Sequence, residues 1–130
     1  MNAHWAWQEK WVEKSVSEEI ALVNSLHSQY DIPIFCTGDF NSNQYSAEYD
    51  RFLSETGVAD LCSQADEAGA LVNQCGGFGT LGSPRTDRRY IDHIFGIGSY
   101  TALRYETILG NEILWISDHA PHIADIKLNY

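Results

Sequence analysis

The stretch DIPIFCTGDFNS, residues 31–42, is an apolar run that ends in small and polar residues. A continuous apolar run of this length is typical of a strand buried on both faces of a sheet. Gly38, Asp39, Asn41 and Ser42 all favour turns, so an ordinary loop would explain them on local grounds. They also place a carboxylate and an amide at a strand end, where a metal ion or a phosphate can be bound. Both interpretations stay open on this stretch alone.

Helical patterns lie on both sides of this strand. From residue 8 to residue 30, apolar residues recur every three or four positions, which predicts a helix with one charged, solvated face. A shorter helix is predicted over residues 46–56, because Ser46 suits an N-cap and Gly57 suits a helix stop. The opening NAHWAW predicts a further strand, with Ala3, Trp5 and Trp7 on one side.

The second half of the chain is expected to consist of strands and loops. Residues 58–89 are irregular and rich in glycine, which predicts long loops around short elements. Strands are predicted at 90–97, 100–109 and 122–130, the first two joined by a hairpin turn at Gly98-Ser99. Residues 110–121 are expected to form a loop. Strands and helices in this order predict an α/β (α+β layered) fold within one domain, residues 1–130.

The composition is that of a chain with a packed core. With 130 residues, 44% of them hydrophobic, the chain fits one domain. Its net charge of −10 disfavours charge-driven binding to nucleic acid or anionic membranes, although a bound divalent cation would reverse the local sign at a phosphate. No apolar stretch is long enough to span a bilayer, and the first residues do not resemble a signal peptide. The compartment is not indicated.

The cysteines do not form a metal-binding pattern. Cys36 lies in the apolar run and is expected to be a small buried hydrophobe. A disulfide between Cys62 and Cys75 stays open as an alternative, without support from the rest of the sequence.

Asp118-His119 is the pair most suggestive of chemistry. Adjacent strand residues point to opposite faces, so both can reach one site only at a bend, which the loop before Pro121 permits. A carboxylate there can bind a hard cation, and the imidazole can act as an acid or a base or bind a phosphate oxygen. Asp92 is the expected carboxylate partner that orients the imidazole of His119.

Structural interpretations remain for each of these groups. Asp92 could be satisfied by Arg88, Arg89 or a backbone amide, and His119 could be a core histidine. Arg88 and Arg89 could instead read a substrate phosphate, because guanidinium groups suit phosphate oxygens. His93 is expected to face solvent or the opposite side of the sheet. His27 is expected on a helix surface, and His122 on the last strand without an evident partner.

Four segments taken together resemble the endonuclease/exonuclease/phosphatase (DNase I-like) superfamily of metal-dependent phosphoesterases. In chain order they are NAHW (2–5), GDFNS (38–42), YIDHIF (90–95) and SDHAP (117–121). The resemblance implies the carboxyl-terminal half of a four-layer αββα sandwich, with a mixed sheet covered by helices on one face. It also implies hydrolysis of a phosphate ester by an activated water, with Mg²⁺ or alternatively Mn²⁺ as cofactor.

The resemblance assigns a role to individual positions. His4 is similar to the histidine that contacts the scissile phosphate. Asp39 and Asn41 resemble the pair that orients the attacking water and stabilises the transition state. Asp92 resembles the partner of the catalytic histidine, His119, and Asp118 resembles a magnesium ligand.

The chain also departs from the family pattern. Family members are usually about twice as long, and their amino-terminal half carries an Asn and a Glu that is the principal metal ligand. Neither is present here, so we expect a partial domain with weak metal affinity. An exposed sheet face, with Trp5, Trp7, Trp11 and Trp115 as candidates for part of it, would favour self-association. The alternative is a non-catalytic module on the same fold that binds a phosphorylated ligand or a protein.

Overall fold

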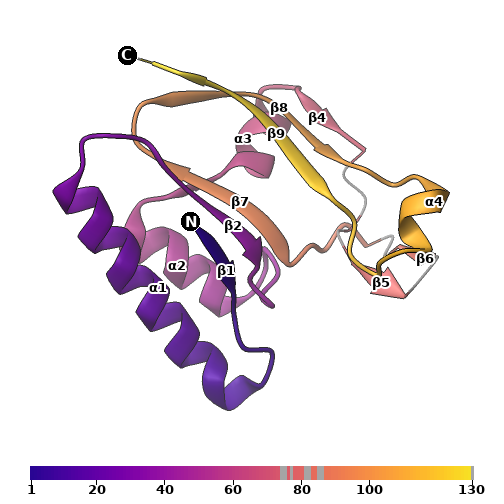
Figure 1. The fold of residues 1–130 in the computed structure, drawn as a ribbon, viewed down its shortest axis with the longest axis horizontal. Coiled ribbons are helices and arrows are strands. Elements are labelled where there is room, and N and C mark those ends of the chain that lie inside the picture. The colour runs from indigo at the N-terminus through magenta and orange to yellow at the C-terminus, as the bar shows by residue number, and fades with distance from the viewer. Residues whose placement is uncertain (74–75, 77, 81–82, 85–86, 130) are drawn as a thin grey trace.

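The computed structural model describes residues 1–73, 76, 78–80, 83–84 and 87–129. Cys75 and Arg85, which the sequence singled out, lie outside these residues. The elements in chain order are β1 (Asn2–His4), α1 (Glu9–Gln29), β2 (Ile34–Asp39), α2 (Ala47–Thr56), β3 (Ala59–Asp60), α3 (Leu61–Glu67), β4 (Leu71–Val72), β5 (Gly79–Thr80), β6 (Ser83–Pro84), β7 (Asp92–Ile97), β8 (Tyr100–Thr107), α4 (Asn111–Leu114) and β9 (His122–Leu128) (Figure 1). The expected mixed α/β fold is confirmed.

A mixed sheet with the strand order β1-β2-β7-β3 forms the centre of the fold. β1 runs parallel to β2, and β7 runs antiparallel to β2. The strand β1 is shorter than the alternation of NAHWAW predicts, because the chain leaves the sheet after His4. Trp5 is then buried, whereas Trp7 is 74% exposed in the turn before α1. The expectation that Trp5 belongs to an exposed face was therefore wrong.

The hairpin predicted at Gly98-Ser99 is not formed. Both edges of β7 are already paired, one with β2 and the other with β3, so β8 cannot pair with it. β8 instead belongs to a second sheet with the order β4-β8-β9, in which it runs antiparallel to β9. The predicted strands are real, but the chain changes sheets at this turn.

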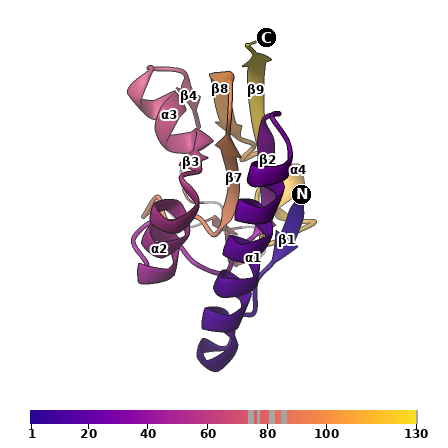
Figure 2. The ribbon, with the colours of Figure 1, turned by 90° about the vertical axis from the view of Figure 1, so that its left-hand side faces the viewer.

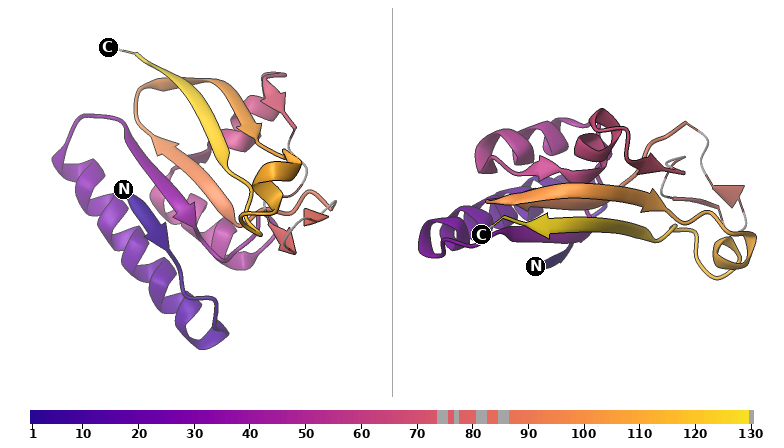
Figure 3. Two further views of the ribbon diagram at one scale, coloured as in Figure 1. Left: turned by 45° about the vertical axis from the view of Figure 1, so that its right-hand side comes forward. Right: turned by 90° about the horizontal axis from the view of Figure 1, so that it is seen from above.

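The helices cover one face of the strands. Figures 2 and 3 show α2 and α3 on the same side of β7. The helix α1 buries Val12, Val16, Ile20 and Val23 against the face that carries Cys36 and Phe95. At roughly 25 cal/mol per Å² of apolar area, this burial is the main stabilising term of the fold. Cys36 is fully buried, as expected, and burial raises the pKa of its thiol to about 11.

The helix α2 begins and ends as its sequence predicts. The hydroxyl of Ser46 accepts a hydrogen bond from the Tyr49 amide, and Gly57 ends the helix with a φ of 74°. In the described residues of the irregular region 58–89, short elements alternate with loops, as expected, and residues 111–114 add one helical turn to a predicted loop. In the described part of the chain, no helix is long and apolar enough to cross a membrane.

Candidate active site

The ends of two neighbouring strands bring Asp39 and Asp92 together. Asp39 is the last residue of β2, Asp92 is the first of β7, and the two are Cα partners in the antiparallel register. On the other side of β2, His4 is the partner of Asp39, and its Nε2 lies 3.5 Å from an Asp39 carboxylate oxygen. The pleat therefore places all three side chains on the sheet face opposite α1 and α2.

The close approach of β1 to β2 depends on Gly38. Its φ is 143°, and an added Cβ would lie 1.9 Å from the Ala3 carbonyl oxygen. The next residues form the turn that local chemistry predicts: the Asp39 carboxylate accepts a 2.8 Å hydrogen bond from the Asn41 amide. Asn41 has a φ of 48°, and its side-chain amide donates to the Trp5 carbonyl at 2.7 Å. Turn and candidate site thus coincide here.

Asp92 and His119 form a direct pair. The Asp92 carboxylate lies 2.7 Å from Nδ1 of His119. Burial raises the pKa of Asp92 more than the hydrogen bond from His119 lowers it. Burial lowers the pKa of His119, but the hydrogen bond to Asp92 and the negative charges of Asp92, Asp39 and Asp118 outweigh this and raise it above its usual value. The His119 imidazole thus holds its proton more strongly than an isolated imidazole does.

Asp118 lies beside the pair on the surface. Its side chain is exposed, and its backbone carbonyl accepts a 2.8 Å hydrogen bond from the Gly79 amide. The described residues contain no group of three or more His, Cys, Asp or Glu side chains arranged to hold a metal ion. Asp118 therefore presents a hard oxygen donor to solvent, and in the described residues it is not part of such a group.

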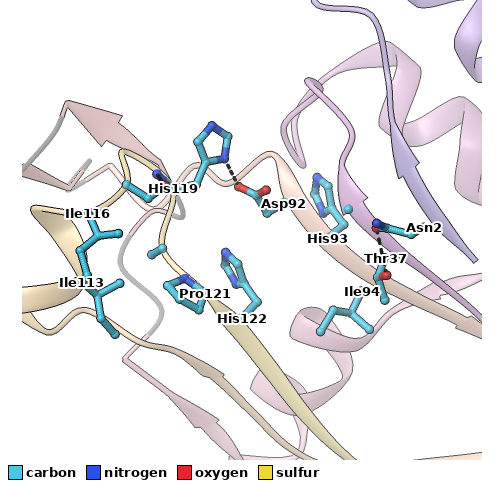
Figure 4. Close-up of a pocket in the computed structure, with 13 residues that line it drawn as sticks. Asn2, Thr37, Asp92, His93, Ile94, Ile113, Ile116, His119, Pro121 and His122 are labelled. Atoms are coloured by element: carbon cyan, nitrogen blue, oxygen red, sulfur yellow. Dashed lines mark hydrogen bonds and ion pairs between the residues drawn. The ribbon is translucent and has the colours of Figure 1, made fainter.

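A cavity of about 650 Å³ opens beside the Asp92–His119 pair (Figure 4). Asn2, Thr37 and Ile94 line it on one side, and Ile113 and Ile116 on the other. Its volume lies within the usual range of about 300–1,000 Å³ for small-molecule sites. The reactive pair can thus meet a ligand held in a concave site.

Arg88 and Arg89 lie elsewhere. Arg88 lines a different cavity of about 410 Å³ together with Tyr49, Cys62 and Tyr90. Its φ is 61°, and the side chain of Gln44 fixes the loop by donating to the Arg88 carbonyl and accepting from the Tyr90 amide. The Nε of Arg89 donates to Asp87 at 2.7 Å. Neither arginine is the partner of Asp92.

A buried polar network behind the sheet was not predicted. Asp60, 2% exposed, accepts hydrogen bonds from the hydroxyls of Tyr90 at 2.9 Å and Tyr49 at 3.0 Å. His93 is 1% exposed, with its Nδ1 3.3 Å from Asp60 and its Nε2 2.8 Å from the Ser42 carbonyl. His93 therefore lies on the opposite side of the sheet from Asp92, one of its two expected positions. In the sequence, the only signal for this position of His93 was that adjacent residues of a strand, here Asp92 and His93, point to opposite faces of the sheet.

His122 also has partners that the sequence did not indicate. Its Nδ1 lies 2.8 Å from the hydroxyl of Tyr105 and 3.3 Å from that of Thr107. Burial lowers the pKa of His122 to about 4, so the ring is neutral at physiological pH.

Comparison with known proteins identifies the chain. The model of the Endonuclease/Exonuclease/phosphatase family matches residues 13–119. The chain belongs to the endonuclease/exonuclease/phosphatase family. A comparison with curated proteins found no match.

Solved structures of this family share the fold. A mannosyl-6-phosphatase of Bacteroides thetaiotaomicron VPI-5482 is 24% identical with a TM-score of 0.79, the match covering 98% of this chain and 50% of that one. An endonuclease/exonuclease/phosphatase family protein of the same species is 23% identical (TM-score 0.79; 96% and 48% covered). The human Nocturnin catalytic domain with bound sulfate is 15% identical (TM-score 0.69; 98% and 46%). The chain thus spans about half the length of these structures.

Proposed function

We propose that this endonuclease/exonuclease/phosphatase chain supplies part of the active site of a Mg²⁺-dependent phosphoesterase that hydrolyses a phosphate ester with an activated water. The observation that carries the proposal is the 2.7 Å Asp92–His119 pair, with Asp39 directly opposite Asp92 at the same sheet edge. Membership of the family supports it. So do the names of two structural neighbours, a phosphatase and a domain that binds a sulfate anion.

Each side chain has a role that fits its geometry. Asp92 holds the His119 ring through Nδ1, which leaves Nε2 of His119 to bond a phosphate oxygen or to exchange a proton with the reacting group. Asp39 orients the attacking water, and the turn at Asn41 fixes the Asp39 carboxylate through the backbone amide. His4, next to Asp39, contacts the scissile phosphate.

Mg²⁺ is the proposed cofactor, with Mn²⁺ as the alternative. Asp118 would hold it through carboxylate oxygen, with water and phosphate oxygens completing the coordination, as is usual for Mg²⁺ bound through one or two carboxylates. The bound ion would neutralise the charge that develops on the phosphoryl oxygens. The exposure of Asp118 fits a cation that is shared with a substrate.

The proposal includes a partial domain. Because the chain spans about half of its structural neighbours, we infer that the complete site needs further residues or a second copy. The strand face opposite α1 and α2, which includes Phe35, is only partly buried and is the proposed surface for self-association. Sedimentation tests this: a monomer at all concentrations would contradict it.

The experiment that tests the function is hydrolysis of plasmid DNA, bis-p-nitrophenyl phosphate and p-nitrophenyl phosphate with Mg²⁺ and with EDTA. Asp39→Ala and His119→Ala are expected to lower kcat about 100-fold or more, as is typical for loss of a positioned acid, base or orienting group. Asp31→Ala and His27→Ala, which change exposed residues of the same types, are the matched controls. Equal rates in all four variants and the wild type would refute the proposal. Absence of turnover would mean that the further residues are required, or that the chain is a binding module.

A further inference from the structure

The cavity beside Asp92 and His119 has an apolar wall that the proposed reaction does not use. Ile113 and Ile116 form this wall, and Figure 4 shows both side chains on one side of the cavity. The Ile116 side chain is 81% exposed, and the neighbouring Trp115, which is not among the residues that line the cavity, is 69% exposed. Large apolar side chains so exposed next to a reactive pair point to an apolar ligand group.

The wall is held in place by the fold. Leu114, 5% exposed, anchors α4 in the protein, and its amide donates to the Gly110 carbonyl at 3.1 Å. The amides of Ile116 and Ser117 both donate to the Ile113 carbonyl, at 2.9 Å and 3.1 Å. These bonds fix the turn that leads directly into Asp118 and His119. The apolar wall and the reactive imidazole therefore keep a defined relative position.

The charged groups around the cavity restrict the class of ligand further. None of the described residues that line it is a lysine or an arginine. Arg88 lines the other cavity, and Arg89 is paired with Asp87. A substrate with several phosphates would need such cations, and in a chain with a net charge of −10 it would be repelled without them. A substrate with one phosphate carries less negative charge and is repelled less.

We propose that Ile113 and Ile116 are specificity-determining residues, and that they select esters in which a single phosphate carries an apolar aromatic or aliphatic group. This inference rests on the proposed function, because it assumes that the phosphate lies at Asp92 and His119. The apolar group would lie against Ile113 and Ile116, opposite Ile94 across the cavity. On this inference, such esters are preferred over nucleic acids and polyphosphates.

The test compares binding of phenylphosphonate and methylphosphonate at saturating Mg²⁺ by calorimetry. Both have a stable carbon–phosphorus bond, so binding is measured whether or not the chain turns over. Phenylphosphonate is expected to bind about tenfold more tightly, since even one methylene in an apolar pocket changes affinity by about that factor. Ile113→Ser and Ile116→Ser are expected to remove most of this preference. Ile32→Ser, 59% exposed and distant from the cavity, should keep it.

The outcomes separate this inference from the proposed function. Equal binding of the two phosphonates, no saturable binding of either, or a preference that survives both isoleucine substitutions would overturn the inference. Turnover without a preference for phenylphosphonate would support the proposed function and contradict the apolar subsite. The preference without turnover would leave the subsite standing and count against catalysis by this chain.

Discussion

Replacing Asp60 by alanine is expected to lower the free energy of unfolding by about 4 kcal/mol. Besides the two tyrosine hydroxyls, the Asp60 carboxylate accepts a 2.8 Å hydrogen bond from the Cys62 amide at the start of α3. His93 lies 3.3 Å away on its remaining side. Alanine removes the common acceptor of all these groups while leaving them buried.

The magnitude follows from what stays unpaired. Each buried donor without a partner costs about 1–3 kcal/mol, and the Cys62 amide and the hydroxyls of Tyr49 and Tyr90 would all lose theirs. A water that enters the space left by the Asp60 carboxylate would recover part of this sum. Removing one partner of a buried charged network costs about 3–5 kcal/mol, which agrees with the estimate. Because small domains have only about 5–15 kcal/mol in total, the loss is a large share of the stability.

Urea unfolding followed by tryptophan fluorescence measures the effect. Trp5, in contact with Phe40 and Phe52, reports on the core. With a slope of about 2 kcal/mol per M, the midpoint of the Asp60→Ala variant should fall by roughly 2 M. Asp31→Ala, at an exposed position, is the matched control and should stay within about 0.5 kcal/mol. A fall of less than about 0.5 M in the Asp60→Ala variant would refute the reasoning.

Three further predictions concern pH and packing. Burial lowers the pKa of His119, and the interaction with Asp92 reverses this shift. In the Asp92→Asn variant, the titration of His119 followed by NMR should therefore move to lower pH. An unchanged titration would show that the pair does not form. In the Gly38→Ala variant, the new Cβ would lie 1.9 Å from the Ala3 carbonyl oxygen. The free energy of unfolding, measured with urea, is therefore expected to fall by about 4 kcal/mol or more. An unchanged midpoint would contradict the close approach of β1 to β2. Burial raises the pKa of Asp60, but the hydrogen bonds that the Asp60 carboxylate accepts outweigh burial and lower this pKa. The contribution of Asp60 to stability is therefore complete above the unfolded pKa of about 3.9, and it is lost as the pH falls through the folded pKa. Stability of Asp60→Asn should fall less steeply with acid than that of the wild type, and parallel curves would rule this out.

Local chemistry was sufficient to predict some elements. The capping residues Ser46 and Gly57 gave both ends of α2, and the apolar run gave β2. For the Asp92–His119 pair, the residue types and the resemblance to the family gave the prediction, and the structure places the two side chains in contact. The roles of these residues in a reaction remain predictions.

Other features depend on contacts between distant segments, which a single sequence does not show. Asp60 and His93 are 33 positions apart, and the strand parity of Asp92-His93 does not show which residue His93 meets. The hairpin between β7 and β8 was predicted from a two-residue turn, a local signal. The competing partner for that edge of β7 was β3, which contributes only Ala59 and Asp60. A strand of this length has too few residues to show the alternation of apolar and polar side chains that predicts a strand.

The change of sheet at Gly98-Ser99 makes the candidate site sensitive to the angle between the two sheets. From this turn β7 and β8 diverge like two arms (Figure 1), with Asp92 at the far end of one arm. His119 lies just before β9, whose first residue, His122, pairs with Thr107 at the far end of the other arm. Each arm is about 20 Å or more in length, so a rotation of about 5° at the turn would separate the ends by roughly 1.7 Å. That is enough to break the hydrogen bond between Asp92 and His119, so the packing of α3 against both β7 and β8 helps to keep the pair together.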